Sequence, residues 1–345
     1  MTTLGQAYSG RDNRFTLIRL VLASMVMLEH IFVVVRGPDA APAIAVHGWS
    51  IGYLAVNGFF ILSGFLIADS LERRQDLKAF LVSRSLRIWP ALIVLGGAAT
   101  LFFGPVFTSL PIEAYLTSPQ TWLYPLHVLL FADTSAGPAG VYADVPAAGE
   151  FSATLWTLRY EVLAYAGLAL VFFTRFAWKT HWLIGLFLGA TVASWLVSDY
   201  VSEAPAMVSS LGRFGSAFLL GVITYRLRAQ LPLSLLGVLI FLLAALAFGS
   251  AQPAEWFWNF ALASAIFWIG LIQLDKIPTA SGMPDWSYGI YIWHYPLMQA
   301  VMFFDERATP LSVGFIAVPI TLLVSAFSWS FFEKPALSLK KWFSS

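Results

Sequence analysis

Long, uninterrupted apolar runs dominate this chain, and short polar stretches separate them. A helix needs about 20 apolar residues to cross a bilayer. On that basis the sequence predicts about ten membrane-spanning helices, at residues 15–35, 46–69, 87–104, 154–173, 181–198, 210–225, 231–249, 255–273, 286–304 and 311–332. The pattern indicates an all-α, polytopic membrane bundle that lies in the lipid bilayer.

The composition agrees with a lipid-facing exterior. Of the 345 residues, 59% are hydrophobic and 11% are charged, whereas about a quarter of the residues in a soluble domain are charged. A net charge of +1 gives no general attraction for nucleic acid. Because the chain has no cysteine, it has no disulfide, thiolate metal site or cysteine nucleophile.

We expect a single membrane domain over residues 1–345, with no appended soluble domain. No internal repeat is visible, which argues against transporters built from duplicated halves. The longest non-cytoplasmic connection covers residues 105–153, and its apolar segment 122–132 is too short to cross. We therefore expect an interfacial or re-entrant segment there. We also expect residues 71–90 to be a cytoplasmic loop and Pro335 to end the last helix.

Charged residues divide the connections into two alternating sets. The basic set contains Arg11, Arg14, Arg73, Arg74, Lys78, Arg84, Arg87, Arg175, Lys179, Arg226, Arg228, Lys276, Lys334, Lys340 and Lys341. The opposite set contains only Arg36 and Arg307 as cations, beside Asp39, Glu113, Asp133, Asp144, Glu150, Asp199, Glu203, Asp305 and Glu306. Since cationic loops stay in the cytoplasm, both termini are predicted to be cytoplasmic.

The first predicted span, "LIRLVLASMVMLEHIFVVV", contains Arg19 and His30. They are roughly 16 Å apart along a helix and project from nearly the same face, because eleven residues make about three turns. Arg19 could simply snorkel to the interface. A histidine at depth favours a functional role, since polar groups inside membranes are usually functional. Glu29 adjoins His30 in sequence and projects from another face.

Two further sites lie near the predicted cytoplasmic side. Arg84 and Arg87 are three residues apart at a helix entrance, so they present one face that suits phosphate binding. The alternative is that they only mark the cytoplasmic side. Ser63 and Gly64 permit close helix approach, and we place them with the two arginines in the binding site for a donor.

The segment "TLWTLRYEVLAY" carries Arg159 and Glu161 close to hydrocarbon. A buried ion pair of Glu161 with Arg159 or Arg213 is one explanation. A carboxylate that orients His30 or accepts a proton is the one we favour. Trp156, at the start of this segment, is a candidate for substrate binding.

The segment "DWSYGIYIWHYPL" places His294 near mid-membrane, with Tyr291 one turn before it. Aromatic belts explain its outer tryptophan and tyrosine but not a mid-span histidine. We assign His294 and Tyr291 to substrate binding, within reach of a cavity shared with His30 and Glu161. No spacing typical of metal ligands connects the histidines, so we expect no metal.

Four motifs in order resemble the acyltransferase-3 family of bacterial membrane acyltransferases. These are "FFILSGFLI", "RSLRIWP", "LWTLRYE" and "SYGIYIWHYP", preceded by an arginine and a histidine with ten residues between them. Many members carry aspartate at the positions of Thr16 and Asn57, so carboxylate roles there do not transfer to this chain. Some relatives add an SGNH-type hydrolase domain, which we do not expect here.

The resemblance implies O-acetyl transfer from cytoplasmic acetyl-CoA to a hydroxyl of an extracytoplasmic or lipid-linked glycan, such as exopolysaccharide or lipopolysaccharide O-antigen. It implies a multi-pass protein of the bacterial inner membrane, with His30 essential and Arg19 and Arg87 functional. We expect His30 to be the general base, with Glu161 and Arg19 completing the catalytic set. An acyl-histidine relay stays open as the competing mechanism.

A transporter or flippase that uses the same polar path without chemistry is the alternative function. An inactive regulatory member is a third, although both Arg19 and His30 are present. The sequence leaves open the acceptor, the acyl group and the partners, which include a homo-oligomer or a glycan-assembly machinery.

Overall fold

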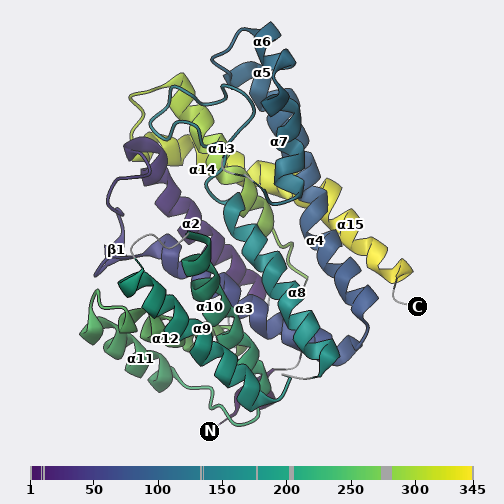
Figure 1. The fold of residues 1–345 in the computed structure, drawn as a ribbon, viewed down its shortest axis with the longest axis vertical. Helices are drawn as coiled ribbons and strands as arrows, with labels where there is room; N and C mark the ends of the chain where they lie inside the picture. Colours follow the sequence, from purple (N-terminus) through teal and green to yellow (C-terminus); the bar gives the residue numbers. More distant parts are fainter. Residues whose placement is uncertain are drawn as a thin grey trace. The chain divides into compact units, whose positions relative to one another are not determined.

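The computed structural model describes residues 2–8, 10, 12–132, 134, 136–175, 178–201, 206–272 and 282–343. Arg11, Asp133, Glu203 and Lys276, which entered the prediction of orientation, lie outside these residues. Most of the described chain is helical (Figure 1). Its single sheet pairs β1 (Ala45–Val46) with β2 (Trp49–Ser50), and each strand has two residues.

Every predicted span coincides with a helix in the described residues. Among the described residues, seven segments are long and apolar enough to cross a membrane: Phe15–Arg36 (α2), Ile51–Arg74 (α3), Leu77–Phe107 (α4 to α5), Leu155–Thr174 (η2 and α8), Thr180–Val197 within α9 (Thr180–Tyr200), Ala206–Arg226 (α10) and Pro310–Trp342 (α14 to η4). The other three are α11 (Leu235–Phe248), α12 (Pro253–Leu271) and α13 (Ser287–Phe304). The all-α polytopic fold is thereby confirmed.

The expectation of a loop at residues 71–90 is wrong, whereas its cytoplasmic side stays a prediction. α3 continues to Arg74, and α4 (Leu77–Ala98) begins at Leu77. The chain turns at Gln75, which takes a left-handed conformation with φ of 52° and donates its N–H to the Leu71 carbonyl. Sequence patterns miss this end because glycine is the usual residue in that conformation.

Pro335 does not end the last helix, contrary to expectation. After α14 (Pro310–Ser328), a π-helical turn, η3 (Trp329–Glu333), leads into α15 (Lys334–Ser338) and the 3₁₀ turn η4 (Leu339–Trp342). Pro335 lies in the first turn of α15, where a missing N–H removes no helical hydrogen bond. A similar π-helical turn, η1 (Ala99–Phe103), joins α4 to α5 (Gly104–Phe107).

Contacts divide the chain into two compact units, each made of three separate segments. Unit 1 comprises Met1–Leu22, Ala45–Leu77 and Tyr160–Pro284, and unit 2 comprises Ala23–Ile44, Lys78–Arg159 and Asp285–Ser345. The boundary between them falls within α2 and again within α8 (Leu158–Thr174). The prediction of a single domain over residues 1–345 stays a prediction.

In unit 1, α3 packs against α10 through two glycines that face each other's backbone. A Cβ atom at Gly64 would overlap the carbonyl of Phe218, and one at Gly221 would overlap the carbonyl of Ile61. Small residues let membrane helices approach closely, which increases van der Waals packing. α10 also packs on α9, and α12 packs on both α11 and α3 (Figure 1).

A buried polar network joins three helices of unit 1. Arg213 on α10 donates from Nε to the side-chain oxygen of Asn57 on α3, at 2.8 Å, and its guanidinium carbon lies 3.2 Å from the centroid of the Tyr53 ring. Asn57 donates to Glu255 and Asn259 of α12, and the Tyr53 hydroxyl also donates to Glu255, at 2.8 Å. The cation and the carboxylate are thus linked through one amide.

In unit 2, the connection between α5 and α8 packs on α13. The sequence of this connection has no continuous helical periodicity. It contains α6 (Ile112–Thr117) and α7 (Pro119–Leu129), followed by irregular chain. The buried Tyr142 hydroxyl donates to the Pro296 carbonyl at 2.9 Å, and burial raises the pKa of this phenol well above its ordinary value. Tyr142 therefore stays a protonated donor that fixes the connection to α13.

We predict that Gly221→Ala lowers the free energy of unfolding by about 1–3 kcal/mol, because the new methyl group meets backbone that cannot rotate away. Thermal unfolding in detergent would show this as a lower Tm. The control is Gly185→Ala on α9, where a Cβ meets nothing within 4 Å. An equal response of the two variants would contradict the close α3–α10 contact.

Candidate functional site

Two histidines from different helices of unit 2 meet in a direct hydrogen bond. His30 of α2 and His294 of α13 approach through Nδ1 and Nε2 respectively, at 2.8 Å, and their ring planes are inclined by only 15°. His294 is fully buried, whereas His30 is half-buried. The structure therefore brings together two of the predicted site residues that lie 264 positions apart.

Hydrogen-bond partners fix the proton positions in this pair. His294 Nδ1 lies 2.7 Å from the Ile290 carbonyl oxygen, which can only accept, so Nδ1 of His294 carries a proton. In neutral His294 the Nε2 atom is then an acceptor, and His30 must donate to it from Nδ1. Neutral His30 consequently has its lone pair on Nε2. That atom is the free base of the pair.

A tyrosine and a carboxylate extend the pair. The Tyr295 ring lies edge-on to His30, with centroids 5.2 Å apart, and its hydroxyl donates to Glu150 Oε2 at 2.8 Å. Gln299, one turn later on α13, donates to the backbone carbonyls of Ala147 and Glu150 at 2.8 and 3.0 Å. These bonds fix the end of the long connection and with it the position of the Glu150 side chain.

Hydrogen bonds connect Tyr291 of α13 to the segment that contains Trp156, so these two predicted substrate-binding residues belong to neighbouring segments. The Thr157 hydroxyl donates to the Thr154 carbonyl, so the Tyr291 hydroxyl donates to Thr157 Oγ1 at 2.7 Å. Thr154 in turn donates to the Tyr291 carbonyl. Half-buried Trp156 belongs to the 3₁₀ turn η2 (Leu155–Thr157) that these bonds tie to α13. Their roles in binding stay predictions.

Arg87 of α4 is held at the start of α13. It donates to Asp285 at 2.7 Å in an ion pair whose two side chains are about nine-tenths buried, with exposures of 14% and 13%. Its guanidinium also lies 5.8 and 5.9 Å from the ring centroids of Tyr288 and Trp329. Arg84 lies one turn earlier, with Nε donating to Ser83 at 3.3 Å.

The remaining predicted site residues belong to unit 1. Arg19 is half-buried on α2, and Glu161 on α8 accepts a hydrogen bond from the Tyr165 hydroxyl. Gly64 lies in the α3–α10 contact, with half-buried Ser63 beside it. Gly64 therefore has a packing role, and donor binding by Ser63 and Gly64 stays a prediction. The expected role of Glu161 beside His30 stays a prediction as well.

Within the described residues, no group of three or more His, Asp or Glu side chains could hold a metal ion. The arrangement around His30 contains groups that can exchange protons. It offers one imidazole lone pair, a neutral imidazole partner and a tyrosine linked to a carboxylate. Such a site can take a proton from a hydroxyl group and release it again.

Asp285, Tyr295 and Glu150 are contacts that the sequence analysis did not assign to the site. Tyr295 could have been found, since it follows His294 directly in "WHYP". Asp285 lies beside aromatic residues just before the start of α13. Carboxylates are common at such interfacial positions, so the sequence did not single it out. Glu150 lies in irregular chain 144 residues before His294, so no local pattern indicated it.

Comparison with known proteins gives a consistent result. The sequence profile of a family described as "acyltransferase domain" matches residues 12–330. Nodulation protein 10 of Rhizobium leguminosarum bv. viciae is 26% identical over 374 residues, which cover 96% of this chain and 95% of that protein. An O-acetyl transferase of Shigella phage Sf6 is 25% identical over 343 residues, covering 95% and 97%. No solved structure matches.

We predict that His30 and His294 both carry their neutral proton on Nδ1. Nitrogen NMR of ¹⁵N-histidine-labelled protein reports the tautomer, and His30→Asn and His294→Asn assign the signals among the five histidines. In His294→Leu, His30 loses its acceptor and should shift toward the Nε2–H tautomer. A His30 signal that is unchanged in this variant would contradict the paired arrangement.

Proposed function

Because the chain belongs to the acyltransferase-3 family, we propose that it is a membrane O-acetyltransferase that moves an acetyl group from acetyl-CoA to a hydroxyl of a glycan. The observation that carries this proposal is the hydrogen bond between His30 and His294, which leaves Nε2 of His30 as a free base. A hydroxyl nucleophile needs such a base at neutral pH.

In the proposed reaction His30 Nε2 removes the proton from the acceptor hydroxyl. The oxygen attacks the thioester carbonyl, an O–C bond forms, and the C–S bond breaks. The CoA thiolate leaves and takes the proton from His30, which returns to its starting form. While His30 is a cation, its Nδ1–H donates to neutral His294 in a charge-assisted bond. An acyl-histidine intermediate is the competing mechanism.

We propose that the phosphates of the donor bind at Arg84 and Arg87 on the cytoplasmic side. Planar guanidinium groups suit phosphate oxygens. Arg87 already forms an ion pair with Asp285, so the donor would share Arg87 with this carboxylate or displace it. Arg84, one turn earlier on α4, donates from Nε to Ser83 at 3.3 Å, and its guanidinium carbon lies 6.0 Å from the Phe80 ring centroid.

The acceptor in this proposal is an extracytoplasmic or lipid-linked glycan, and the membrane is the bacterial inner membrane. One similar protein is named as an O-acetyl transferase of a phage and another as a nodulation protein. Association with glycan-assembly proteins, or with a second copy of the chain, belongs to the same proposal.

The first test measures acetyl-CoA consumption by purified protein in lipid, with a glycan acceptor. We expect His30→Gln to lower kcat by about 10²–10⁴-fold, the usual contribution of a general base. Binding of acetyl-CoA should persist, because His30 lies on α2 and the proposed donor site lies on α4. Binding without consumption by wild-type protein across a panel of glycan acceptors would instead favour a transporter.

His294 is a positioning residue in this proposal, and a matched pair of variants tests that role. His294→Gln retains a side-chain oxygen that can accept from His30, whereas His294→Leu has none. We expect kcat to fall about tenfold or more in the leucine variant and less in the glutamine variant, with KM for acetyl-CoA unchanged in both. Equal loss in the two variants would contradict positioning through the hydrogen bond.

The donor site predicts a different kinetic signature. Arg84→Gln should raise KM for acetyl-CoA about tenfold, the effect of losing one charge-assisted contact, and leave kcat nearly unchanged. The control is Arg74→Gln, which removes an exposed cation at the end of α3. If both variants raise KM equally, the effect is general electrostatics and the assignment of Arg84 fails.

A further inference from the structure

The Glu150 carboxylate has an unused hydrogen-bonding position close to the histidine pair. Its Oε2 atom accepts the Tyr295 hydroxyl at 2.8 Å, and the Tyr295 ring lies edge-on to His30, with centroids 5.2 Å apart. No more than one phenol ring therefore separates the carboxylate from the imidazole. Among the described residues, no group donates to Oε1 of Glu150 and no cation forms an ion pair with this carboxylate.

Other contacts already attach this part of the chain to α13. Gln299 donates to the backbone carbonyls of Ala147 and Glu150, at 2.8 and 3.0 Å. The Tyr142 hydroxyl donates to the Pro296 carbonyl at 2.9 Å. These three bonds do not involve the side chain of Glu150, so attachment of the connection does not explain why a carboxylate stands at this position.

A second acceptor without a partner lies on the same face of α13. Gln299 comes four residues after Tyr295, so the two side chains share one face of the helix. The amide nitrogen of Gln299 is used in its two bonds to the connection, whereas its Oε1 atom is buried and accepts no hydrogen bond. Buried acceptors are normally satisfied by protein or by bound water. The structure therefore indicates a donor near this face that does not belong to the protein.

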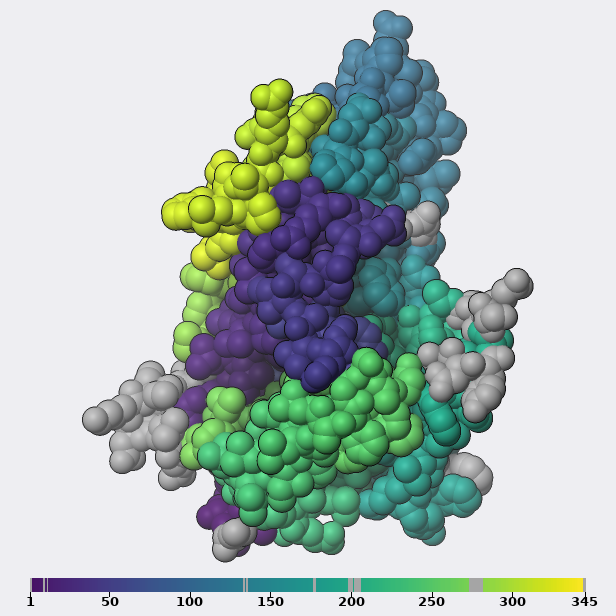
Figure 2. All heavy atoms as spheres, turned by 90° about the vertical axis from the view of Figure 1, so that its left-hand side faces the viewer, coloured from purple at the N-terminus to yellow at the C-terminus, as the bar shows by residue number. Residues whose placement is uncertain are grey.

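The Glu150 carboxylate can be reached from outside the bundle. Glu150 is half-buried, and exposed Gly149 has no atom of a non-neighbouring residue within 4 Å of the position of a Cβ. The end of α2, in dark purple, lies against the same connection, in teal (Figure 2), and a Cβ at Gly37 would be 3.5 Å from the Pro146 carbonyl oxygen. The sequence places this connection on the non-cytoplasmic side, from which the acceptor arrives in the proposed function.

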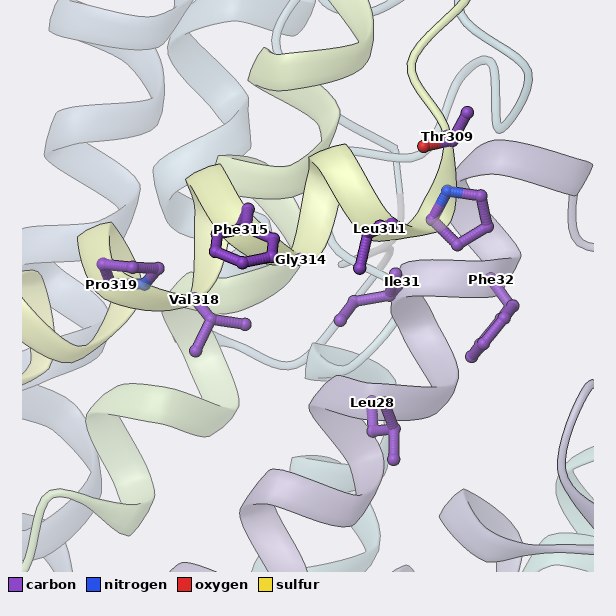
Figure 3. Close-up of a pocket in the computed structure, with 10 residues that line it drawn as sticks. Leu28, Ile31, Phe32, Thr309, Leu311, Gly314, Phe315, Val318 and Pro319 are labelled. Atoms are coloured by element: carbon purple, nitrogen blue, oxygen red, sulfur yellow. The ribbon is translucent and has the colours of Figure 1, made fainter.

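The other side of α2 offers no comparable groups. Leu28, Ile31 and Phe32 line an apolar groove against α14 (Figure 3). The hydroxyl in this lining belongs to Thr309, and it caps the start of α14. His30 is two positions from both Leu28 and Phe32, so it projects from nearly the opposite side of the helix. A molecule rich in hydroxyl groups therefore finds hydrogen-bond partners beside Glu150 and not in this groove.

We propose that Glu150 binds the acceptor, and that the acceptor carries at least two free hydroxyl groups. One hydroxyl donates to Nε2 of His30 and loses its proton there, while a second donates to Oε1 of Glu150. An ionised carboxylate only accepts hydrogen bonds, so the group that it binds must be a donor. A charge-assisted bond of this kind is roughly twice as strong as a neutral one.

This inference rests on the proposed function for the role of His30, and it restricts the substrate class. The acceptor is a unit with several hydroxyl groups, such as a sugar residue that is unsubstituted near the acetylated position. Glu150 stays ionised throughout and takes no part in the proton transfer. It is a binding residue that determines which hydroxyl of the acceptor reaches His30.

Saturation-transfer NMR without acetyl-CoA tests the site, with the methyl glycosides of glucose, galactose, mannose, rhamnose and N-acetylglucosamine as probes. We expect wild-type protein in lipid nanodiscs to bind at least one of them about tenfold more tightly than Glu150→Gln, the effect of one charge-assisted bond. The glutamine still accepts from Tyr295, so the connection keeps its position. The control is Asp144→Asn, an exposed carboxylate of the same connection, which should bind as the wild type does.

Two results overturn the proposal at this stage. The first is that wild-type protein binds none of the glycosides. The second is that Glu150→Gln binds them as the wild type or the Asp144→Asn control does. If Glu150→Gln fails to fold, Tyr295→Phe decides the question, because it removes the donor that positions the carboxylate. This variant should bind the same glycoside about threefold more weakly or worse, and unchanged binding would contradict the site.

Monodeoxy analogues of the bound glycoside identify the hydroxyl group that contacts Glu150. Removing that hydroxyl should weaken binding to wild-type protein about tenfold and binding to Glu150→Gln much less, because the contact is already lost in the variant. If the effect of every deoxy analogue is the same in both proteins, Glu150 acts indirectly and the proposal fails.

These binding measurements contain no acetyl donor, so their outcome is separate from that of the proposed function. Binding that depends on Glu150, in a protein that transfers no acetyl group, would support the glycan site and contradict the transferase. Acetyl transfer that does not depend on Glu150 would contradict this inference and leave the transferase standing. Where both hold, Glu150→Gln should raise KM for the glycan and leave KM for acetyl-CoA unchanged.

Discussion

Hydrocarbon offers no hydrogen-bond partner, so every polar side chain inside the spanning helices must find one within the protein. This constraint explains two of the polar groupings among the described residues. In unit 1, Arg213 and Glu255 are joined through the amide of Asn57. In unit 2, His30 has His294, and His294 has the Ile290 carbonyl. Each grouping connects separate helices and so contributes to their register as well as to their solvation.

The same constraint determines which nitrogen atoms of the two histidines carry protons. A backbone carbonyl can only accept, so the proton on His294 is assigned, and the proton on His30 follows from it. The one unused position of the pair is Nε2 of His30, on a half-buried side chain. Helix geometry thus selects which nitrogen can act as a base.

Hydropathy was enough to place the helices, because a long apolar run in a membrane has few alternatives. It failed at helix ends that depend on backbone conformation. Gln75 in a left-handed turn and the π-helical turn before Pro335 carry no strong sequence signal. Of the site, the choice of His30 and His294 as two histidines on apolar helices could be made from the sequence. Their direct bond, and the positions of Asp285 and Glu150, depend on packing between distant segments and could not.

The neutral partner of His30 has a consequence for the proposed reaction. When a carboxylate orients a histidine, protonation of the imidazole leaves a neutral pair. Here protonation would leave one net positive charge on two imidazoles, and the Glu150 carboxylate is connected to the pair through the Tyr295 ring. A buried uncompensated charge is unfavourable in a membrane protein. The arrangement therefore favours a cation that lasts only while a negative charge develops beside it, on the attacked carbonyl and then on the leaving thiolate. Proton removal and attack would then proceed together, which distinguishes this pair from a site that stores the proton between steps.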